Sequence, residues 1–224
     1  MQTTEVTFEA TSSSGDVSGV LLRPDDAVAL YVFGHGAGAG MRHVFMEGVA
    51  SRLAERSVAT FRYNFPYMEA GRRAPNPAPI LLKTVRSAVA EAARLAPGLP
   101  LLAGGKSMGG RMTSTAASEE ELPTVKALAF FGFPLHAPGR DSSERGAHLA
   151  EVRLPMLFLQ GSRDKLANLD LLAPLLDRVH PAPRLHVAVG ADHGFHVLKR
   201  SGRTDDEVLD ELCDVFVEWM PGVV

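Results

Sequence analysis

Residues 101–109 decide the fold of this chain, and they read Leu101-Leu102-Ala103-Gly104-Gly105-Lys106-Ser107-Met108-Gly109. A short apolar run leads here directly into the motif G-x-S-x-G, and a helical pattern begins near Met108. A serine between glycines at a strand–turn–helix junction is typical of a nucleophile elbow, whose sharp turn lifts the hydroxyl clear of the backbone. The motif also occurs in ordinary glycine-rich turns, so its interpretation depends on the residues around it.

The same residues resemble the end of a phosphate-binding loop, because that loop also ends in Gly-Lys-Ser. Its motif requires a glycine five positions before Gly105, where this chain has Pro100. The strand also runs directly into Gly104, which leaves no chain to wrap around phosphates. We therefore exclude a phosphate-binding loop.

Further short apolar runs predict the other strands of a parallel sheet. These runs lie at 28–33, 58–63, 125–131, 155–159 and 185–189, and the run at 100–104 before Ser107 completes the set. Continuous apolar runs of this length are typical of strands that are buried on both faces. Nearer the N-terminus, apolar and polar residues alternate around the turn-rich Ser12-Ser13-Ser14-Gly15-Asp16, which predicts a β-hairpin.

Stretches with helical periodicity separate the apolar runs. One covers residues 43–55, and Val44 is among the side chains expected on its buried face. Others cover 81–95 and 169–179, and the last helix opens with the capping-box pattern Thr204-Asp205-Asp206-Glu207. An antiparallel start followed by repeated strand–helix units predicts an α/β fold with a mostly parallel sheet of about eight strands and helices on both faces.

Composition limits the classes of protein that fit this chain. The 224 residues suit one domain with one sizeable core. The chain has 23 Lys and Arg against 26 Asp and Glu, without a long block of like charge, so we expect neither a nucleic acid nor a membrane as partner. Cys213 is the one cysteine, and residues 1–10 are polar and acidic rather than signal-like, which predicts a cytoplasmic protein.

A second motif, Gly34-His35-Gly36-Ala37-Gly38-Ala39-Gly40, directly follows the predicted strand at 28–33. Such small residues let main-chain N–H groups approach a ligand closely, as an oxyanion hole requires. The motif also satisfies the dinucleotide pattern G-x-G-x-x-A. The acid that usually binds ribose about 20 residues later is missing, but Arg62 could meet a 2′-phosphate instead. An NADP site therefore stays open as an alternative.

Two further loops supply an acid and a base. Asp164 follows the strand at 155–159, and His193 follows the last strand. Each could be ordinary polar surface, but together with Ser107 they follow strands of one parallel sheet in the order Ser, Asp, His. A carboxylate can orient a histidine, and a histidine can act as general base toward a serine. Asp141 is the alternative acid.

His193 also lies three residues before His196, which is a spacing that metal ligands can have. No nearby acid or thiol completes a metal set, so we predict no metal site.

These motifs resemble those of small single-domain α/β-hydrolases of the dienelactone-hydrolase-like group. The resemblance runs from the two N-terminal strands to the final helix, and it is carried by His35-Gly36-Ala37-Gly38-Ala39, Arg62-Tyr63-Asn64-Phe65-Pro66-Tyr67, Gly105-Lys106-Ser107-Met108-Gly109-Gly110-Arg111 and Asp192-His193. It implies one α/β-hydrolase domain over residues 1–224. Dienelactone hydrolases use a cysteine nucleophile, whereas this chain has serine there. The dienelactone substrate is therefore not implied, and Cys213 is expected in the core.

Together these features predict a serine hydrolase. We expect Ser107 to attack an ester carbonyl, His193 to remove the serine proton and Asp164 to hold the imidazole. The oxyanion is expected to accept hydrogen bonds from the backbone N–H groups of Met108 and Ala37, with Gly38 as the alternative second donor. His35, Gly36 and Gly38 are predicted to contact the substrate, and no cofactor is expected.

Residues 132–153 have room for a short flap or one helix but not for a large lid. We therefore expect small soluble carboxylic esters, or thioesters, as substrates. Arg62, Arg72, Arg73, Lys106 and Arg111 could favour an anionic substrate or could serve as solvated or ion-paired surface. The alternatives are a catalytically idle binding or scaffold protein of the same fold and an NADP-dependent reductase. The sequence does not indicate an oligomeric state.

Overall fold

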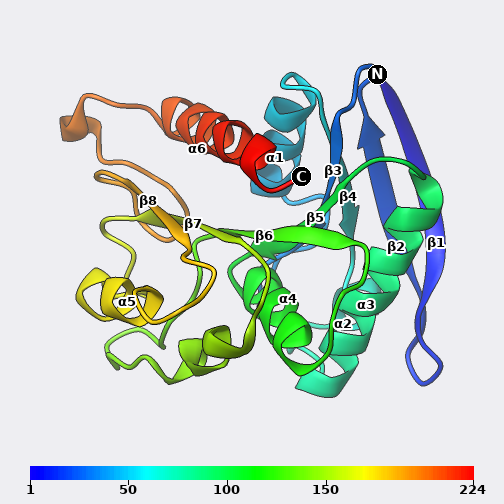
Figure 1. Cartoon of the computed structure of the whole chain (residues 1–224), viewed down its shortest axis with the longest axis horizontal. Coiled ribbons are helices and arrows are strands. Elements are labelled where there is room, and N and C mark those ends of the chain that lie inside the picture. Colours follow the sequence, from blue (N-terminus) through cyan, green and yellow to red (C-terminus); the bar gives the residue numbers. More distant parts are fainter.

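The computed structural model describes residues 1–224 and is built on one eight-stranded sheet (Figure 1). The order across the sheet is β1-β2-β4-β3-β5-β6-β7-β8. β2 pairs antiparallel with β1 and β4, and every other pairing is parallel. The strands are β1 (Gln2–Thr11), β2 (Gly15–Arg23), β3 (Ala29–Gly34), β4 (Val58–Tyr63), β5 (Leu101–Lys106), β6 (Val125–Phe131), β7 (Met156–Gly161) and β8 (Arg184–Ala188).

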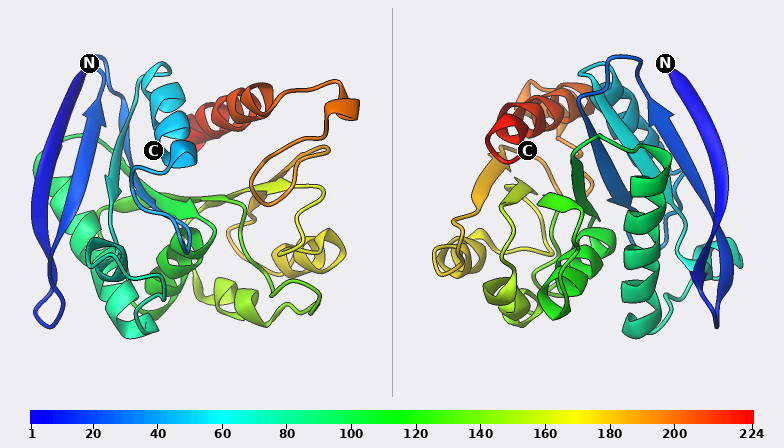
Figure 2. Two further views of the ribbon diagram at one scale, coloured as in Figure 1. Left: turned by 180° about the vertical axis from the view of Figure 1, so that it is seen from behind. Right: turned by 45° about the vertical axis from the view of Figure 1, so that its right-hand side comes forward.

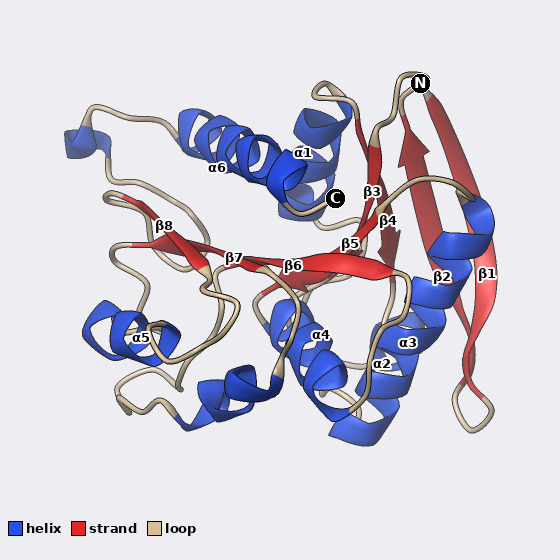
Figure 3. Cartoon of the chain, viewed as in Figure 1, coloured by secondary structure: helices blue, strands red, loops and turns tan.

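Helices cover both faces of the sheet, as predicted (Figures 1 and 3). One face carries α1 (Val44–Ala54) and α6 (Asp205–Trp219), and the other carries α3 (Ala78–Leu95), α4 (Met108–Glu119) and α5 (Leu169–Leu176). The remaining helical segments are α2 (Pro66–Glu69) and the 3₁₀ helices η1 (Glu144–Glu151), η2 (Lys199–Ser201) and η3 (Met220–Gly222). None of the helices combines the length and the apolar composition needed to span a membrane.

Two large apolar clusters form most of the core, one on each face of the sheet. Alternation along β3 shows the division, because Leu30 and Val32 belong to one cluster while Tyr31 and Phe33 belong to the other. Cys213 lies in the cluster beneath α1 and α6, where burial raises the pKa of its thiol to about 12. This cysteine is therefore core, as predicted.

The N-terminus of α1 differs from the expectation. Val44 was predicted to face the core, but it is 78% exposed. The buried face of α1 consists instead of Phe45, Met46, Val49, Ala50, Leu53 and Ala54. A helix advances by about 100° per residue, which places Val44 on the side of α1 opposite to this face.

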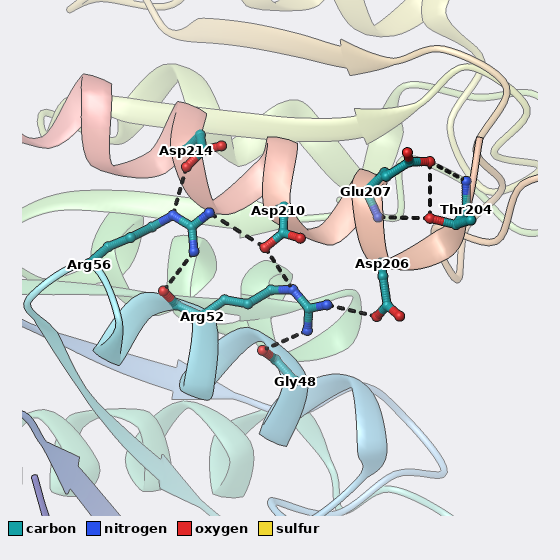
Figure 4. Close-up of polar contacts among 8 residues, drawn as sticks. All are labelled: Gly48, Arg52, Arg56, Thr204, Asp206, Glu207, Asp210 and Asp214. Carbon is teal, nitrogen blue, oxygen red and sulfur yellow. Dashed lines mark hydrogen bonds and ion pairs between the residues drawn. The ribbon is translucent and has the colours of Figure 1, made fainter. Parts of the chain in front are cut away.

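α1 and α6 lie side by side and are joined by a ladder of ion pairs (Figures 2 and 4). Arg52 contacts Asp206 at 2.7 Å and Asp210 at 3.1 Å, while Arg56 contacts Asp214 at 2.6 Å and Asp210 at 3.4 Å. The predicted capping box at the start of α6 is also present. This packing holds the last helix against the sheet next to the loop that follows β8.

Candidate active site

Ser107 occupies the sharp turn between β5 and α4. Its backbone has φ 51° and ψ −115°, a strained conformation that residues other than glycine rarely adopt. The Ser107 N–H donates to the Phe131 carbonyl at 3.1 Å, which ties the turn to the end of the neighbouring strand β6. The turn therefore has the geometry of a nucleophile elbow.

Two glycines allow the start of α4 to lie directly against the end of β3. A Cβ atom on Gly105 would come within 2.4 Å of the Gly34 carbonyl oxygen, and one on Gly109 within 2.3 Å of the same atom. No side chain fits at these distances, so the motif needs glycine on both sides of Ser107. This close approach brings the glycine-rich loop after β3 beside the Ser107 hydroxyl.

His193 connects Ser107 to a buried carboxylate. Its Nε2 atom lies 2.9 Å from Ser107 Oγ, and its Nδ1 atom lies 2.7 Å from Asp164 Oδ2. The Asp164 side chain is fully buried and the His193 ring is partly exposed. Because an ionised carboxylate can only accept, Nδ1 carries the proton and Nε2 is free to accept the serine hydroxyl. The structure thus brings together the three side chains that the sequence singled out.

Gln160 holds the Asp164 carboxylate in place, and the sequence reasoning did not identify it. Its Nε2 donates to Asp164 Oδ2 at 2.6 Å, and its Oε1 accepts from the Phe133 N–H at 2.9 Å. The Leu166 N–H donates to the other carboxylate oxygen at 2.7 Å. Gln160 is fully buried near the end of β7. A polar residue within an apolar strand was the available signal.

The alternative acid lies elsewhere. Asp141 is exposed, accepts from Asn168 Nδ2 at 2.7 Å and lies 3.6 Å from His136 Nε2. Asp192 accepts from the backbone N–H groups of Gly194 and His196 and shapes its own loop. Neither carboxylate contacts the His193 ring, so Asp164 is the acid that this geometry pairs with His193.

Another serine–histidine pair joins α4 to η1 but lacks the arrangement that catalysis needs. Ser114 Oγ lies 2.8 Å from His148 Nε2, and the same hydroxyl donates to the Arg111 carbonyl at 3.0 Å. The Arg111 carbonyl thus competes for the one hydroxyl proton that a general base would have to accept. No carboxylate contacts His148. Burial and, secondarily, Arg111 lower the pKa of His148 to about 4.

A family comparison agrees with this geometry. Residues 27–221 match the family described as the α/β hydrolase domain. The chain belongs to the α/β hydrolase family.

Solved structures with the same fold cover nearly the whole hydrolase. Dienelactone hydrolase from Anabaena variabilis superposes with a TM-score of 0.75 at 20% identity, over 100% of each chain. The esterase domain of a Rhodothermus marinus protein gives 0.75 at 19%, over 100% of this chain and 99% of that one. An α/β serine hydrolase without a lid from Xanthomonas campestris gives 0.75 at 18%, over 99% and 96%. These likenesses establish the fold, which is the one predicted.

Two backbone N–H groups of the hydrolase, those of Met108 and Ala37, have no hydrogen-bond partner within the chain, as candidates for an oxyanion hole should. Met108 is the first residue of α4, and the first N–H groups of a helix have no partner within it. The Ala37 N–H makes no hydrogen bond within the chain. Ala37 also lines both of the cavities that flank Ser107, whereas Gly38 lines only one. Ala37 is thus the better placed of the two candidate second donors.

His35 does not lie where the sequence reasoning placed it. It was predicted to contact substrate, but it is fully buried and lines neither cavity. Its Nε2 accepts from the Phe65 N–H at 3.0 Å, so Nδ1 carries the proton and donates to the Gly36 carbonyl at 2.8 Å. Burial lowers the pKa of His35 to about 4, which keeps it neutral. Gly36 and Gly38 do line the cavity, and His35 fixes the loop that carries them.

The dinucleotide alternative does not fit this structure. Arg62, the candidate for a 2′-phosphate, is 5% exposed and donates to the Met41 carbonyl at 3.1 Å. The glycine-rich loop ends well before α1 begins at Val44, whereas a dinucleotide fingerprint turns directly into a helix.

No group of three His, Cys, Asp or Glu side chains is arranged to hold a metal ion.

Lys106 supports the histidine loop of the hydrolase, a role that the sequence reasoning did not assign to it. Its Nζ donates to the His193 carbonyl at 2.7 Å and lies over the rings of Phe45 and Phe195. Burial lowers the pKa of Lys106 to about 8. The ammonium group of Lys106 therefore binds the loop that carries His193.

Two cavities flank Ser107. The first, of about 390 Å³, is lined by the glycine-rich loop, Phe45, Lys106 and His193. The second, of about 490 Å³, is lined by residues of α4 and of the segment after β6, and by Asn76, Arg111 and Arg145. A larger groove of about 700 Å³ lies along β1 and β2 and includes neither Ser107 nor His193. We therefore place the site at the two cavities beside Ser107.

Proposed function

We propose that this α/β hydrolase is a serine hydrolase that cleaves small carboxylic esters or thioesters through an acyl-enzyme on Ser107. The single observation that carries the proposal is the chain of contacts from Asp164 through His193 to a serine on a strained turn. Two of its atoms, His193 Nε2 and Ser107 Oγ, are already within hydrogen-bond distance at 2.9 Å. Serine, imidazole and carboxylate in this order are the parts that acyl transfer needs.

In the first step, Ser107 Oγ bonds to the substrate carbonyl carbon while His193 Nε2 accepts the hydroxyl proton. Asp164 stabilises the imidazolium that forms. The oxyanion accepts hydrogen bonds from the N–H groups of Met108 and Ala37. The ester C–O bond then breaks, and His193 returns the proton to the leaving alcohol.

In the second step, water attacks the acyl-enzyme. His193 accepts a proton from the water, the bond from the acyl carbon to Ser107 Oγ breaks, and the proton passes to the serine oxygen. The products are a carboxylic acid and an alcohol. The absence of a large cap over the cavities and their modest volumes favour small substrates.

A fluorophosphonate probe tests the proposal, because it labels only an activated serine. We expect labelling of the wild-type protein, loss of labelling in Ser107→Ala, and hydrolysis of short-chain 4-nitrophenyl esters by the wild type alone. Ser114→Ala is the matched control, since Ser114 lies on α4 and also contacts a histidine, His148 of η1, and this variant should label normally. Folded wild-type protein that neither labels nor hydrolyses any ester would favour an idle binding or scaffold protein instead.

A further inference from the structure

The cavity of about 490 Å³ contains two arginines that no group in the chain neutralises. Arg111 is the fourth residue of α4, and Arg145 comes from η1. Neither side chain forms an ion pair or a hydrogen bond with the rest of the protein, and both line the wall beside Ser107, Arg111 half-buried and Arg145 exposed. By contrast, arginines such as Arg52 and Arg86 are paired with carboxylates.

The wall of this cavity also holds buried polar atoms without a partner. Among the few buried side-chain atoms that lack a hydrogen bond within the chain, Arg111 Nε and Asn76 Oδ1 both belong to it. Burial and the neighbouring Arg145 lower the pKa of Arg111, and no acid offsets them. A half-buried guanidinium without a partner is costly, and an anionic ligand would remove that cost through charge-assisted hydrogen bonds.

The position of His193 decides which part of the substrate enters this cavity. His193 lines the other cavity, of about 390 Å³, and not this one. The leaving alcohol must lie next to His193, because it takes the proton from the imidazole. The acyl group therefore extends from Ser107 into the arginine-lined cavity. Apolar wall residues such as Met112, Pro134 and Leu166 suit a short hydrocarbon chain between the carbonyl and the arginines.

We propose that Arg111 and Arg145 bind a carboxylate at the far end of the acyl group, so that the preferred substrates are monoesters of dicarboxylic acids. This inference rests on the proposed function. The products are then a free dicarboxylate and an alcohol. Arginine suits the task, because its planar group can form two parallel hydrogen bonds with a carboxylate.

A matched pair of substrates tests this inference. We compare mono-4-nitrophenyl adipate with 4-nitrophenyl hexanoate, which share the acyl chain length and differ in a terminal carboxylate against a methyl group. The readout is the ratio of kcat/KM for the charged ester to kcat/KM for the neutral one. A wild-type ratio well above one is expected, and Arg111→Gln and Arg145→Gln should each lower the ratio by about 10- to 100-fold, as expected for hydrogen bonds to a charged group. Arg153→Gln removes an exposed charge outside the cavity and should leave the ratio unchanged.

The outcomes separate this inference from the proposed function. Hydrolysis of the neutral ester with a ratio of one or less, or with a ratio that neither cavity arginine affects, would overturn the carboxylate site and leave the esterase intact. If no ester is hydrolysed, binding of adipate to Ser107→Ala is measured by calorimetry. Binding that Arg111→Gln abolishes would support the site in a protein that is not an esterase, and absence of binding would overturn it.

Discussion

Asp164 and Asp141 are two aspartates in loops at the same edge of the sheet, and their surroundings give them different tasks. Asp164 is buried, and its Oδ2 atom accepts hydrogen bonds from Gln160 Nε2 and His193 Nδ1. Asp141 is exposed and contacts Asn168. Because only one of them can hold the imidazole with its proton on Nδ1, only one should matter to the reaction.

We expect Asp164→Asn to lower kcat for a short ester by about 10³- to 10⁴-fold, since an amide in this place favours the wrong imidazole tautomer. Asp141→Asn is the matched control and should stay within about twofold of wild type, because this exposed carboxylate does not reach the imidazole. Steady-state kinetics on the two purified variants measures both effects. A large loss in Asp141→Asn with normal turnover in Asp164→Asn would contradict the assignment.

At the scale of the element, α6 combines a capping box with the ion-pair ladder to α1 (Figure 4). Thr204 Oγ1 accepts from the Glu207 N–H at 3.2 Å, and Glu207 Oε2 accepts from the Thr204 N–H at 2.7 Å. The side chains of the three aspartates in the ladder are between 48% and 82% exposed. Exposed ion pairs contribute little, so the cap should matter more than any single pair.

Thr204→Ala should therefore lower the free energy of unfolding by about 1 kcal/mol, as loss of an N-cap usually does. Asp214→Asn, which removes one exposed partner of Arg56, should lower it by less than about 0.5 kcal/mol, and added salt should shrink this smaller effect. Urea unfolding at low and at high ionic strength measures both. A larger loss in Asp214→Asn than in Thr204→Ala would show that the ladder dominates.

At the scale of the whole molecule, a buried neutral histidine links stability to pH. Burial lowers the pKa of His35 from 6.5 to about 4, so the unfolded chain binds a proton more readily than the folded one. The stability that neutral His35 contributes is fully present above pH 6.5, the pKa of histidine in the unfolded chain, and is lost as the pH falls from 6.5 toward 4. His148, whose pKa is lowered to about the same value, acts in the same direction.

We expect this linkage to cost about 2 kcal/mol of unfolding free energy for His35 between pH 7 and pH 5, at about 1.4 kcal/mol per pKa unit. His35→Gln keeps an acceptor for the Phe65 N–H but does not titrate. Its unfolding free energy should start lower and then fall by about 2 kcal/mol less than that of wild type over the same interval. Chemical denaturation at the two pH values measures the difference, and equal losses in both proteins would contradict it.

Local sequence determined the sheet, the helices and the identities of Ser107, Asp164 and His193, because each of these depends on short-range patterns. Apolar runs define buried strands, G-x-S-x-G defines the turn, and the shared edge of a parallel sheet brings the following loops together. Tertiary structure alone decided which groups of the chain meet. It placed Gln160 on Asp164, Lys106 on the His193 carbonyl and His35 inside the protein rather than in the cavity.

The arginine-lined cavity shows the same limit most clearly. Arg111 and Arg145 lie on separate elements, and the sequence cannot tell a paired surface arginine from one that lacks a carboxylate. Whether a charge is neutralised depends on side chains that reach it from other parts of the chain, and burial sets how much that pairing is worth. The sequence by itself therefore determined the fold and singled out the three proposed catalytic residues, whereas the packing of α4 against the segment after β6 decided what lines the cavity proposed for the acyl group.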